Sequence, residues 1–593
     1  MVARTLVISA DDRAWPKDQS EPILFLGEWC RTYSNKNLLE DIDYKIAKYH
    51  WDDRKKLYED YKYLDAIYEK ILINLAKKLN YIHCVNYDLR YWRIFIGPWL
   101  FTFIGILFDR WSCLSKAIDS YEITSINCLA RKDINSLPND YSEAKEMYRN
   151  DYWNEMIFSQ LANKFMNNNK IIIKNLLVGP FEKKSNISRK PKIDFKLIVQ
   201  TILNKISAWV RSDEDYFFIS TYLHLFTDIR LQIRLKQFPQ VWRNTLSTPV
   251  SDLKLDMRDW ILTNEINENN FDKVVHLMIP LHIPMLYLEG YKNLMSTIDN
   301  LPWPNRPKAI FTSNSHYSDD IFQAWAAEKT EKGVPLFIGQ HGGNYGMSPF
   351  SSHDQHEFTI ADKWLSWGWS DQYKKKIKPV GNLIAMNNTA KYDPNGAGLL
   401  VQMSSPRYAD NIMAVPIAGQ YLSYLEDQGA FINALPTELS HQLIVRLQNV
   451  PCSFHNAEEY WRSNFPSLQF DSGERPIKSL IMKSRIYIST YNATSYLLSL
   501  TWNIPSLIFW NQAHWELNDE ASQYIQILES AGIFHKTPES AANHLIKIWN
   551  DIPSWWNSKE VQDARKEFCN KYSYVPEKPL NKLESVFKDN ITV

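Results

Sequence analysis

A histidine set between glutamine and paired glycines is the first candidate for chemistry in this chain. The apolar residues 334–339, which read as a strand, run directly into Gln340-His341-Gly342-Gly343-Asn344-Tyr345, here called the glycine turn. Paired glycines let the backbone approach a ligand and present its amide N–H groups. The imidazole would then face a crevice, suited to acid/base chemistry or to binding an anion. A structural turn is the alternative, but the adjacent Asn344 and Tyr345 add contact groups and favour function.

A second polar segment separates a strand-like run from a helix-like run near the C-terminus. It consists of Thr490, Tyr491, Asn492, Ala493, Thr494 and Ser495, here called the 490–495 loop. Free N–H groups at the start of the helix, together with the helix dipole, would form a phosphate site, whereas capping without a ligand is the alternative. Neither GxGxxG nor GxxxxGK(S/T) occurs, so the common dinucleotide and P-loop sites are excluded.

Further polar groups follow strand ends in the second half of the chain. Ser404, Ser405 and Arg407 come just after the predicted strand 399–403, and Arg446 lies in the predicted strand 443–447. Either guanidinium group could hold a phosphate or a sugar carboxylate, and a surface salt bridge is the alternative. We assign these residues to a donor site, together with the glycine turn and the 490–495 loop.

One of several carboxylates could act as a base or a nucleophile. The candidates are Asp11, Asp12, Glu28, Asp319, Asp320 and Glu357, each of which has a structural role as its alternative. Asp319 and Asp320 are consecutive, so from a helix they would point in different directions and would not pair. Residues 353–357 match neither HExxH nor HxxEH, and we therefore expect no metal site.

Composition limits the class of protein. A chain of 593 residues exceeds what one core usually organises, so we expect two or more domains. The 67 basic and 67 acidic residues cancel, which gives no electrostatic signature of nucleic-acid binding. Six scattered cysteines without a CxxC pair indicate a reducing compartment.

We also expect a cytoplasmic chain without a signal peptide or a membrane span. The first residues lack the long apolar region of a signal peptide and read as a strand. The longest apolar run, residues 94–108, is shorter than the roughly 20 residues that a membrane span needs. It predicts a buried helix, with peripheral membrane contact as the alternative.

The order of the predicted elements indicates an α/β fold. The pattern from about residue 37 to 162 is helical, and strands alternate with helices from about residue 270. The predicted strands are 5–9, 23–26, 171–173, 274–279, 309–312, 334–339, 363–369, 399–403, 443–447, 486–489 and 505–510. The polar stretch 386–398 marks a domain boundary. We predict two Rossmann-like domains facing a cleft, residues 1–390 with a helical insertion at about 37–265, and residues 398–593.

An ordered set of short motifs resembles the transferases of O-antigen and surface-carbohydrate gene clusters, from residue 4 to about 515. The motifs are Ala-Asp-Asp-Arg at 10–13, Phe-Leu-Gly-Glu-Trp-Cys-Arg at 25–31, Tyr-Trp-Arg-Ile at 91–94 with Gly-Pro-Trp at 97–99, Asp-Arg-Trp at 109–111, Phe-Thr-Ser-Asn at 311–314, Gly-Gln-His-Gly-Gly-Asn-Tyr-Gly at 339–346, Trp-Gly-Trp at 367–369 and Thr-Tyr-Asn-Ala-Thr at 490–494. The resemblance implies a metal-independent glycosyltransferase of the two-domain GT-B kind, which acts in the cytoplasm at the inner membrane.

Within that resemblance, the C-terminal domain would hold the donor nucleotide and the N-terminal domain the acceptor. The implied acceptor contacts are Asp12, Arg13, Trp29 and Arg31. The Gln-His-Gly turn is also similar to that of transferases using CMP-activated 3-deoxy-ulosonic acids such as Kdo, and of teichoic-acid-type polymerases. Two positions depart from the pattern: Ala493 stands where a small hydroxyl residue is usual, and Leu498 where many such transferases have a glutamate for the donor ribose.

The sequence therefore predicts a glycosyltransferase of bacterial surface polysaccharide. Its partners would be a nucleotide sugar and a glycan or lipid-linked glycan acceptor, with no cofactor and no nucleic acid. His341 would face the reacting sugar, and Glu28, Asp319, Asp320 or Glu357 would act as base or nucleophile. A CDP-polyol phosphotransferase and a non-catalytic glycan-binding assembly protein are the alternatives.

Overall fold

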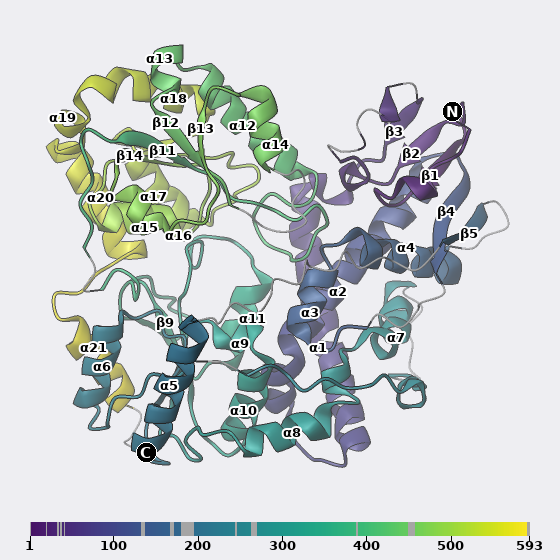
Figure 1. Cartoon of the computed structure of the whole chain (residues 1–593), viewed down its shortest axis with the longest axis horizontal. Coiled ribbons are helices and arrows are strands. Elements are labelled where there is room, and N and C mark those ends of the chain that lie inside the picture. The colour runs from purple at the N-terminus through teal and green to yellow at the C-terminus, as the bar shows by residue number, and fades with distance from the viewer. Residues whose placement is uncertain are drawn as a thin grey trace.

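The computed structural model describes residues 2–589, except 19, 33–34, 36–37, 41, 132–136, 167–170, 179–194, 244–245, 263–269, 387–388 and 449–456. Its strands form three sheets, which divide the chain into an N-terminal, a middle and a C-terminal part (Figure 1). Every strand pair in these sheets is parallel. The predicted α/β class with Rossmann-like sheets is confirmed, and the structure adds a third sheet.

The N-terminal sheet has the strand order β3-β2-β1-β4-β5. Its strands are β1 (Arg4–Val7), β2 (Ile23–Phe25), β3 (Tyr44–Ile46), β4 (Ile123–Arg131) and β5 (Ile172–Val178), and its helices are α1 (Arg54–His83), α2 (Leu89–Ser120), α3 (Tyr141–Met147) and α4 (Asp151–Phe165). The predicted helical insertion at 37–265 therefore also contains strands. Of these strands, β3, β4 and β5 complete a sheet with β1 and β2 that is separate from the middle sheet.

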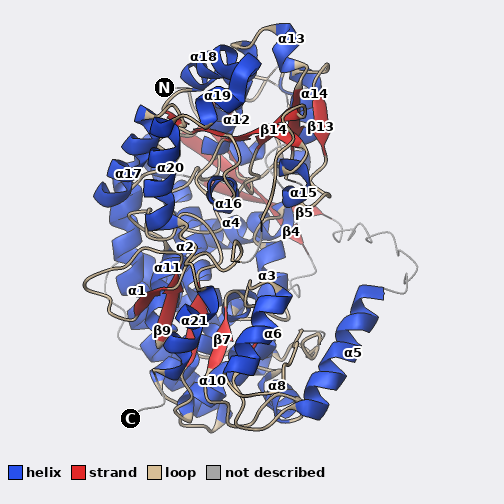
Figure 2. Cartoon of the chain, turned by 90° about the vertical axis from the view of Figure 1, so that its left-hand side faces the viewer, coloured by secondary structure: helices blue, strands red, loops and turns tan. Residues whose placement is uncertain are grey.

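The middle sheet has the order β10-β9-β8-β7-β6. Its strands are β6 (Phe217–Phe218), β7 (Ile310–Thr312), β8 (Leu336–Gly339), β9 (Lys363–Ser366) and β10 (Ile377–Pro379), and its helices are α5 (Phe195–Val210), α6 (Leu225–Arg234), α7 (Asn270–His282), α8 (Tyr291–Asp299), α9 (Ser315–Ser318), α10 (Asp320–Glu331) and α11 (Ser352–Ile360). Figure 2 shows its strands below those of the C-terminal sheet.

The C-terminal sheet has the order β13-β12-β11-β14-β15-β16. Its strands are β11 (Ala397–Val401), β12 (Leu443–Arg446), β13 (Gln469–Asp471), β14 (Ser484–Ser489), β15 (Ser506–Phe509) and β16 (Phe534–His535). The helices that follow β11 are α12 (Gln420–Asn433), α13 (Thr437–Ser440), α14 (Ala457–Asn464), α15 (Ile477–Ile481), α16 (Thr494–Thr501), α17 (Asp519–Ser530), α18 (Pro538–Ile548), α19 (Ile552–Trp556), α20 (Lys559–Tyr572) and α21 (Pro579–Lys588).

The prediction of a strand at 274–279 is wrong, because these residues belong to α7. A short continuous apolar run does not distinguish a strand from a buried helix by its periodicity. In the structure Val274, Val275, Met278 and Ile279 are buried at helical spacing, and α7 packs against α2.

Helix α2 is the central packing element, and it contains the predicted buried helix 94–108. It contacts α1, α4, α7, α10 and α11, which explains why its surface is apolar on nearly every side. Among the described residues it is the one helix long and apolar enough to cross a membrane, but 94% of its most apolar window is buried inside the protein. Gly97 lets α11 approach closely, since a Cβ there would lie 2.6 Å from the imidazole of His356.

The chain end returns from the C-terminal part to the middle sheet. After α20, the Tyr574 N–H donates to the Trp367 carbonyl at 2.8 Å, and α21 packs beside α6 (Figure 1). Phe587 of α21 is fully buried, with its ring 5.1–5.4 Å from the rings of Phe218, Phe311 and Phe337. The last helix thus closes one face of the middle sheet.

Replacing Phe587 with alanine should therefore destabilise the middle part by about 3–5 kcal/mol, the usual cost of removing a buried phenylalanine ring. Differential scanning fluorimetry should show a lower first unfolding transition. Phe238→Ala removes a ring that is 72% exposed and should leave that transition in place. Equal transitions for the two variants would contradict the packing role of α21.

Candidate functional site

The glycine turn leaves the carboxyl end of β8 and points toward the C-terminal part. Gln340 shapes this turn. Its Oε1 accepts the backbone N–H of Trp367 at 2.9 Å and the indole N–H of Trp369 at 3.0 Å, and its Nε2 donates to the Gly342 carbonyl at 2.8 Å. The side-chain amide that we assigned to donor binding is thus engaged within the turn.

His341 is presented by the turn with 22% of its side chain exposed. Its neighbours are Tyr345, Glu357 of α11, His316 of α9 and Tyr222 from the loop after β6. The ring centroids of Tyr222 and His341 lie 6.2 Å apart at an interplanar angle of 27°. Tyr222, His316 and Glu357 come from three other segments of the chain, so only the folded middle part assembles this group.

Glu357 is the buried anion of this group. Its Oε1 accepts the Tyr345 hydroxyl at 2.8 Å and lies 3.1 Å from His316 Nε2, and its Oε2 accepts the Trp364 indole N–H at 3.1 Å. Burial raises the pKa of this carboxyl, but the imidazoles of His316 and His341 and these hydrogen bonds outweigh burial and bring the pKa to about 2. Glu357 is therefore ionised at neutral pH, which excludes a role as a proton donor.

His341 has the properties of a general base. Burial lowers its pKa below the ordinary 6.5, while the Glu357 carboxylate, 3.9 Å away, opposes that shift. The Tyr345 hydroxyl lies 3.2 Å from His341 Nε2 and 3.5 Å from Nδ1. Because that hydroxyl gives its only proton to Glu357, its oxygen accepts an N–H of the imidazole. A neutral imidazole has one ring nitrogen with a lone pair, which could take a substrate proton.

The glycine turn and the 490–495 loop meet directly. The Gly343 N–H donates to Thr494 Oγ1 at 3.1 Å, and Asn492 Nδ2 donates to Asn344 Oδ1 at 3.1 Å. A Cβ on Gly343 would lie 2.3 Å from the carbonyl carbon of Ala493, so a side chain there has no room. Gly343 thus serves an approach of backbone to backbone between two parts of the chain.

The 490–495 loop lies at the point where the strand order of the C-terminal sheet reverses, between β11 and β14. In open α/β sheets, ligands bind in the crevice outside the carboxyl ends of such strands. Ala493 gives α16 no side-chain cap, so its first-turn amides are not satisfied by the cap residue. Ser404 Oγ, after β11, is buried without a partner in the described part of the chain. This geometry suits an anionic ligand.

Other members of the predicted donor set are engaged within the protein. The Ser495 hydroxyl accepts from Tyr487 at 2.6 Å and lies 3.1 Å from the Tyr491 hydroxyl, and the Thr490 hydroxyl donates to the Val401 carbonyl. Ser405 is buried.

The two predicted arginines differ in position. Arg446 donates to the carbonyl oxygens of Gly473 and Arg475 and pairs with Asp471 at 3.9 Å. Burial raises the pKa of Tyr491 in the 490–495 loop, and the charge of Arg446 acts to lower it. Arg407 instead joins two parts of the chain, because it pairs with Asp151 of α4 and donates to the Trp29 carbonyl at 3.0 Å.

Of the candidate carboxylates, the structure brings Glu357 beside His341. Asp319 caps α10 by accepting the Phe322 N–H at 3.0 Å. Asp320 accepts the Tyr287 hydroxyl, and burial together with the charge of Asp140 raises its pKa to about 7. Glu28 pairs with Arg31 in the N-terminal part. No ion pair or hydrogen bond joins these three to His341 in the residues that the structure describes.

The predicted acceptor contacts lie at the carboxyl edge of the N-terminal sheet, on a different sheet from His341. Asp12 begins the short helix after β1, and the neighbouring Arg13 pairs with Asp11. Trp29 is 2% exposed, and its ring stacks on Phe158. Arg31 is held by Glu28. The assignment of these four residues to an acceptor site stays a prediction. Trp29 lies in the core.

Sequence reasoning missed His316 and Tyr222. His316 follows the predicted strand 309–312 by four residues, and polar residues past a strand end are a usable signal. Tyr222 follows a strand of only two residues, for which the pattern gave no indication. Its backbone, like that of Ser220, is left-handed, with φ of 61° and 50°. Such strained positions concentrate at functional sites.

A hollow of about 310 Å³ opens beside Tyr222, at the carboxyl edge of β6 and β7. Asn314, Asp228, Trp242 and Arg243 also line it. Tyr222 lines this hollow and its ring centroid lies 6.2 Å from that of His341, so the hollow opens close to the imidazole.

Alanine at Gly343 should loosen the contact between the middle and C-terminal parts, at a cost of about 1–3 kcal/mol for overpacking. Gly342→Ala is the matched control, because its Cβ would find Thr494 Oγ1 at 3.4 Å, an ordinary contact. Thermal unfolding should place Gly343→Ala below the unchanged chain and Gly342→Ala close to it. The opposite ranking would rule out the backbone contact.

Three comparisons place the chain among known proteins. No curated protein matches it. Its structure is similar to the wall teichoic acid polymerase TagF (10% identity, 67% of this chain and 96% of that chain, TM-score 0.33), to MurG of Acinetobacter baumannii (9%, 50% and 77%, 0.28) and to WaaG, a glycosyltransferase involved in lipopolysaccharide biosynthesis (11%, 63% and 98%, 0.26). The family model described as LIC12162 family transferase matches residues 4–587, so this chain belongs to the LIC12162 family of transferases.

Proposed function

We propose that this transferase moves a sugar from a nucleotide-activated donor to a glycan or lipid-linked glycan of a bacterial surface polysaccharide. The observation that carries the proposal is the neutral His341, held by Tyr345 and Glu357 opposite the crevice of the C-terminal sheet. The family is one of transferases, and the motif series resembles those of surface-carbohydrate clusters. We place the reaction in the cytoplasm, at the inner face of the membrane.

His341 would start the reaction by taking the proton of an acceptor hydroxyl. The acceptor oxygen then forms a bond to the anomeric carbon of the donor sugar, and the bond from that carbon to the nucleotide phosphate breaks. The nucleotide leaves with the electron pair. Glu357, an ionised carboxylate 3.9 Å from the imidazole, stabilises the imidazolium that forms. The amides at the start of α16 face the charge that develops on the leaving phosphate.

The hollow beside Tyr222 is where we propose that the acceptor hydroxyl enters. It opens at the carboxyl edge of the middle sheet, and the Tyr222 ring next to it suits the face of a sugar. Asp12, Arg13 and Arg31, on the N-terminal sheet, stay predicted contacts for a more distant part of the acceptor.

The base role of His341 predicts a specific pH profile. A base acts when deprotonated, so the rate should fall as pH decreases through the pKa of His341. Because burial lowers that pKa below 6.5, kcat should stay level from pH 8 down to 6.5 and fall only at more acidic pH. His341→Ala should lose about 10²–10⁴-fold in kcat, measured as glycoside formation by mass spectrometry.

The pH profile also tests which carboxylate acts on the pKa of His341. The Glu357 charge raises the His341 pKa, so Glu357→Gln should move the acid limb to lower pH and reduce the plateau. Glu28→Gln makes the same chemical change on another sheet and should leave the acid limb where it is. If the acid limb moves in Glu28→Gln and not in Glu357→Gln, Glu357 is not the carboxylate that acts on His341. Full turnover by His341→Ala would show that His341 is not the base.

The donor site predicts stabilisation by a nucleotide. Saturating CMP, CDP, UDP or GDP should raise the unfolding temperature, with about 2.7 kcal/mol gained at a concentration of 100 Kd. Ser404→Trp should remove this shift by filling the crevice, whereas Ser530→Trp, at the exposed end of α17, should retain it. Absence of a shift with all four would contradict a nucleotide donor. Release of CMP with a phosphodiester product would instead identify the CDP-polyol alternative.

A further inference from the structure

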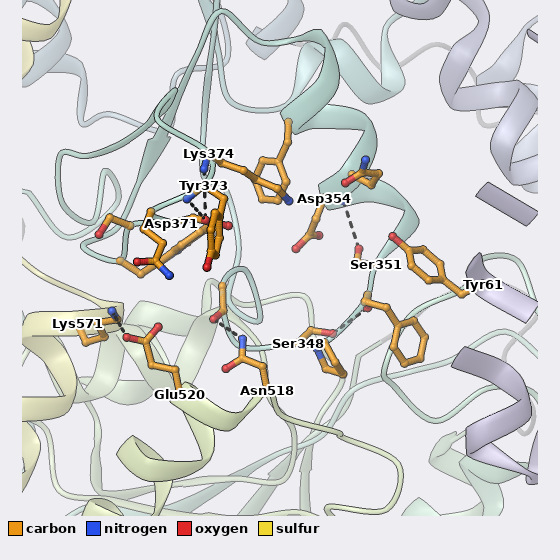
Figure 3. A pocket seen from close by; sticks show the side chains of 18 residues that line it. Tyr61, Ser348, Ser351, Asp354, Asp371, Tyr373, Lys374, Asn518, Glu520 and Lys571 are labelled. Carbon is orange, nitrogen blue, oxygen red and sulfur yellow. Dashed lines mark hydrogen bonds and ion pairs between the residues drawn. The ribbon is translucent and has the colours of Figure 1, made fainter. Parts of the chain in front are cut away.

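A second hollow shares no lining residue with the hollow beside Tyr222 and has no part in the reaction above. Its volume is about 660 Å³, within the range of about 300–1,000 Å³ of small-molecule sites. It is lined by α1, by residues before and in α11, by the loop after β9, and by α17 and α20 (Figure 3). None of residues 340–345 lines it, so it is separate from His341.

Aromatic rings form several of its walls. Trp369 is fixed by its hydrogen bond to Gln340 and by close packing on Gly346, where a Cβ would lie 2.4 Å from the indole. The rings of Phe350 and Tyr58 pack 5.4 Å apart by their centroids, and Tyr61, which lines the hollow, lies equally near Phe350. Tyr373 stands at the rim with 87% of its surface exposed. Trp369 and Phe350, each 5% exposed, mainly shape the hollow, whereas Tyr61 and Tyr373 offer ring surface for an apolar ligand face.

The charged groups on the wall do not suit a phosphate. Lys571 pairs with Glu520, and Lys374 lies 4.6 Å from the centre of the Phe358 ring, so both cations already have partners (Figure 3). Asp371 accepts the backbone N–H of Tyr373 at 2.8 Å and leaves its carboxylate on the wall. Asp371 and Glu520 balance the two lysines, so the wall has no surplus of positive charge to hold an anionic ligand.

Asp354 supplies hydrogen-bonding capacity inside the hollow. It stands in the first turn of α11, with Ser351 as the helix cap, and no ion pair engages its carboxyl in the described residues. Burial raises the pKa of Asp354 to about 7, against the lowering effect of Ser351. Near neutral pH this carboxyl can therefore both donate and accept a hydrogen bond. Gln355 and Gln372 add side-chain amides to the same walls.

We propose that this hollow is a second carbohydrate-binding site, which takes a neutral oligosaccharide. Aromatic faces suit the C–H faces of sugar rings, and carboxyl and amide groups suit their hydroxyls. The site is built by the middle part together with α17 and α20 of the C-terminal part, so a bound glycan would contact both. The proposal does not depend on the transfer reaction at His341.

A microarray of neutral oligosaccharides from bacterial surface polysaccharides tests the site, with phosphorylated and carboxylated glycans on the same slide. The full chain, without any nucleotide, should bind neutral glycans and not the anionic ones. Tyr373→Ala should reduce the signal at least about tenfold, the effect of 1.4 kcal/mol. Tyr81→Ala is the matched control, because it removes an 80% exposed tyrosine at the far end of α1 and should leave binding unchanged.

Two further variants keep the outcome clear. Gln372→Trp places a bulky ring in the hollow from an exposed position and should also abolish binding. His341→Ala should bind neutral glycans as the unchanged chain does, even where it has lost transfer. Loss of transfer with binding intact separates the two sites. Absence of binding to every neutral glycan, or binding that persists in both Tyr373→Ala and Gln372→Trp, would overturn the proposal.

Discussion

Glu357 is only 2% exposed inside the middle part. Removing such an ion from water costs several kcal/mol of folding free energy unless its neighbours compensate. Tyr345, Trp364 and His316 supply that compensation from three separate segments. The requirement fixes where α11 lies, and α11 reaches its place because Gly97 leaves room on α2. Through the same carboxylate, Tyr345 is turned toward His341. Core packing and candidate chemistry are therefore set by one buried charge.

Asp354 and Glu357 are three residues apart on α11, yet their pKa values move in opposite directions, to about 7 and about 2. Both carboxyls are withdrawn from water, which alone raises a carboxyl pKa. Glu357 also has two imidazoles beside it, whereas Asp354 faces a hollow lined by rings and by other carboxylates. One helix thus presents an ionised carboxylate to His341 and a carboxyl that is partly protonated near pH 7 to the proposed glycan site.

The candidate transfer site depends on how the parts of the chain are held together. Gly343 meets Ala493 backbone to backbone, and no larger residue fits at that contact. Two ion pairs join the N-terminal part to the C-terminal part: Asp151 of α4 pairs with Arg407, and Arg54 of α1 pairs with Glu516. Arg407 therefore contributes to the site by joining two parts of the chain, whatever ligand the crevice holds.

The sequence by itself determined the elements whose signals are local. Apolar runs ending in polar turns located β8 with the glycine turn and β14 with the 490–495 loop, and the length of the run 94–108 indicated a buried helix. Tertiary structure decided the rest. A third sheet arises because strands before and after α1 and α2 pair across long separations, and α7 is a helix because it packs on α2. His316, Tyr222 and the choice of Glu357 over Glu28, Asp319 and Asp320 as the neighbour of His341 follow from contacts between distant segments. Periodicity and turn chemistry are properties of neighbouring residues, whereas the environment of a buried charge is set by residues that only the packed fold brings together.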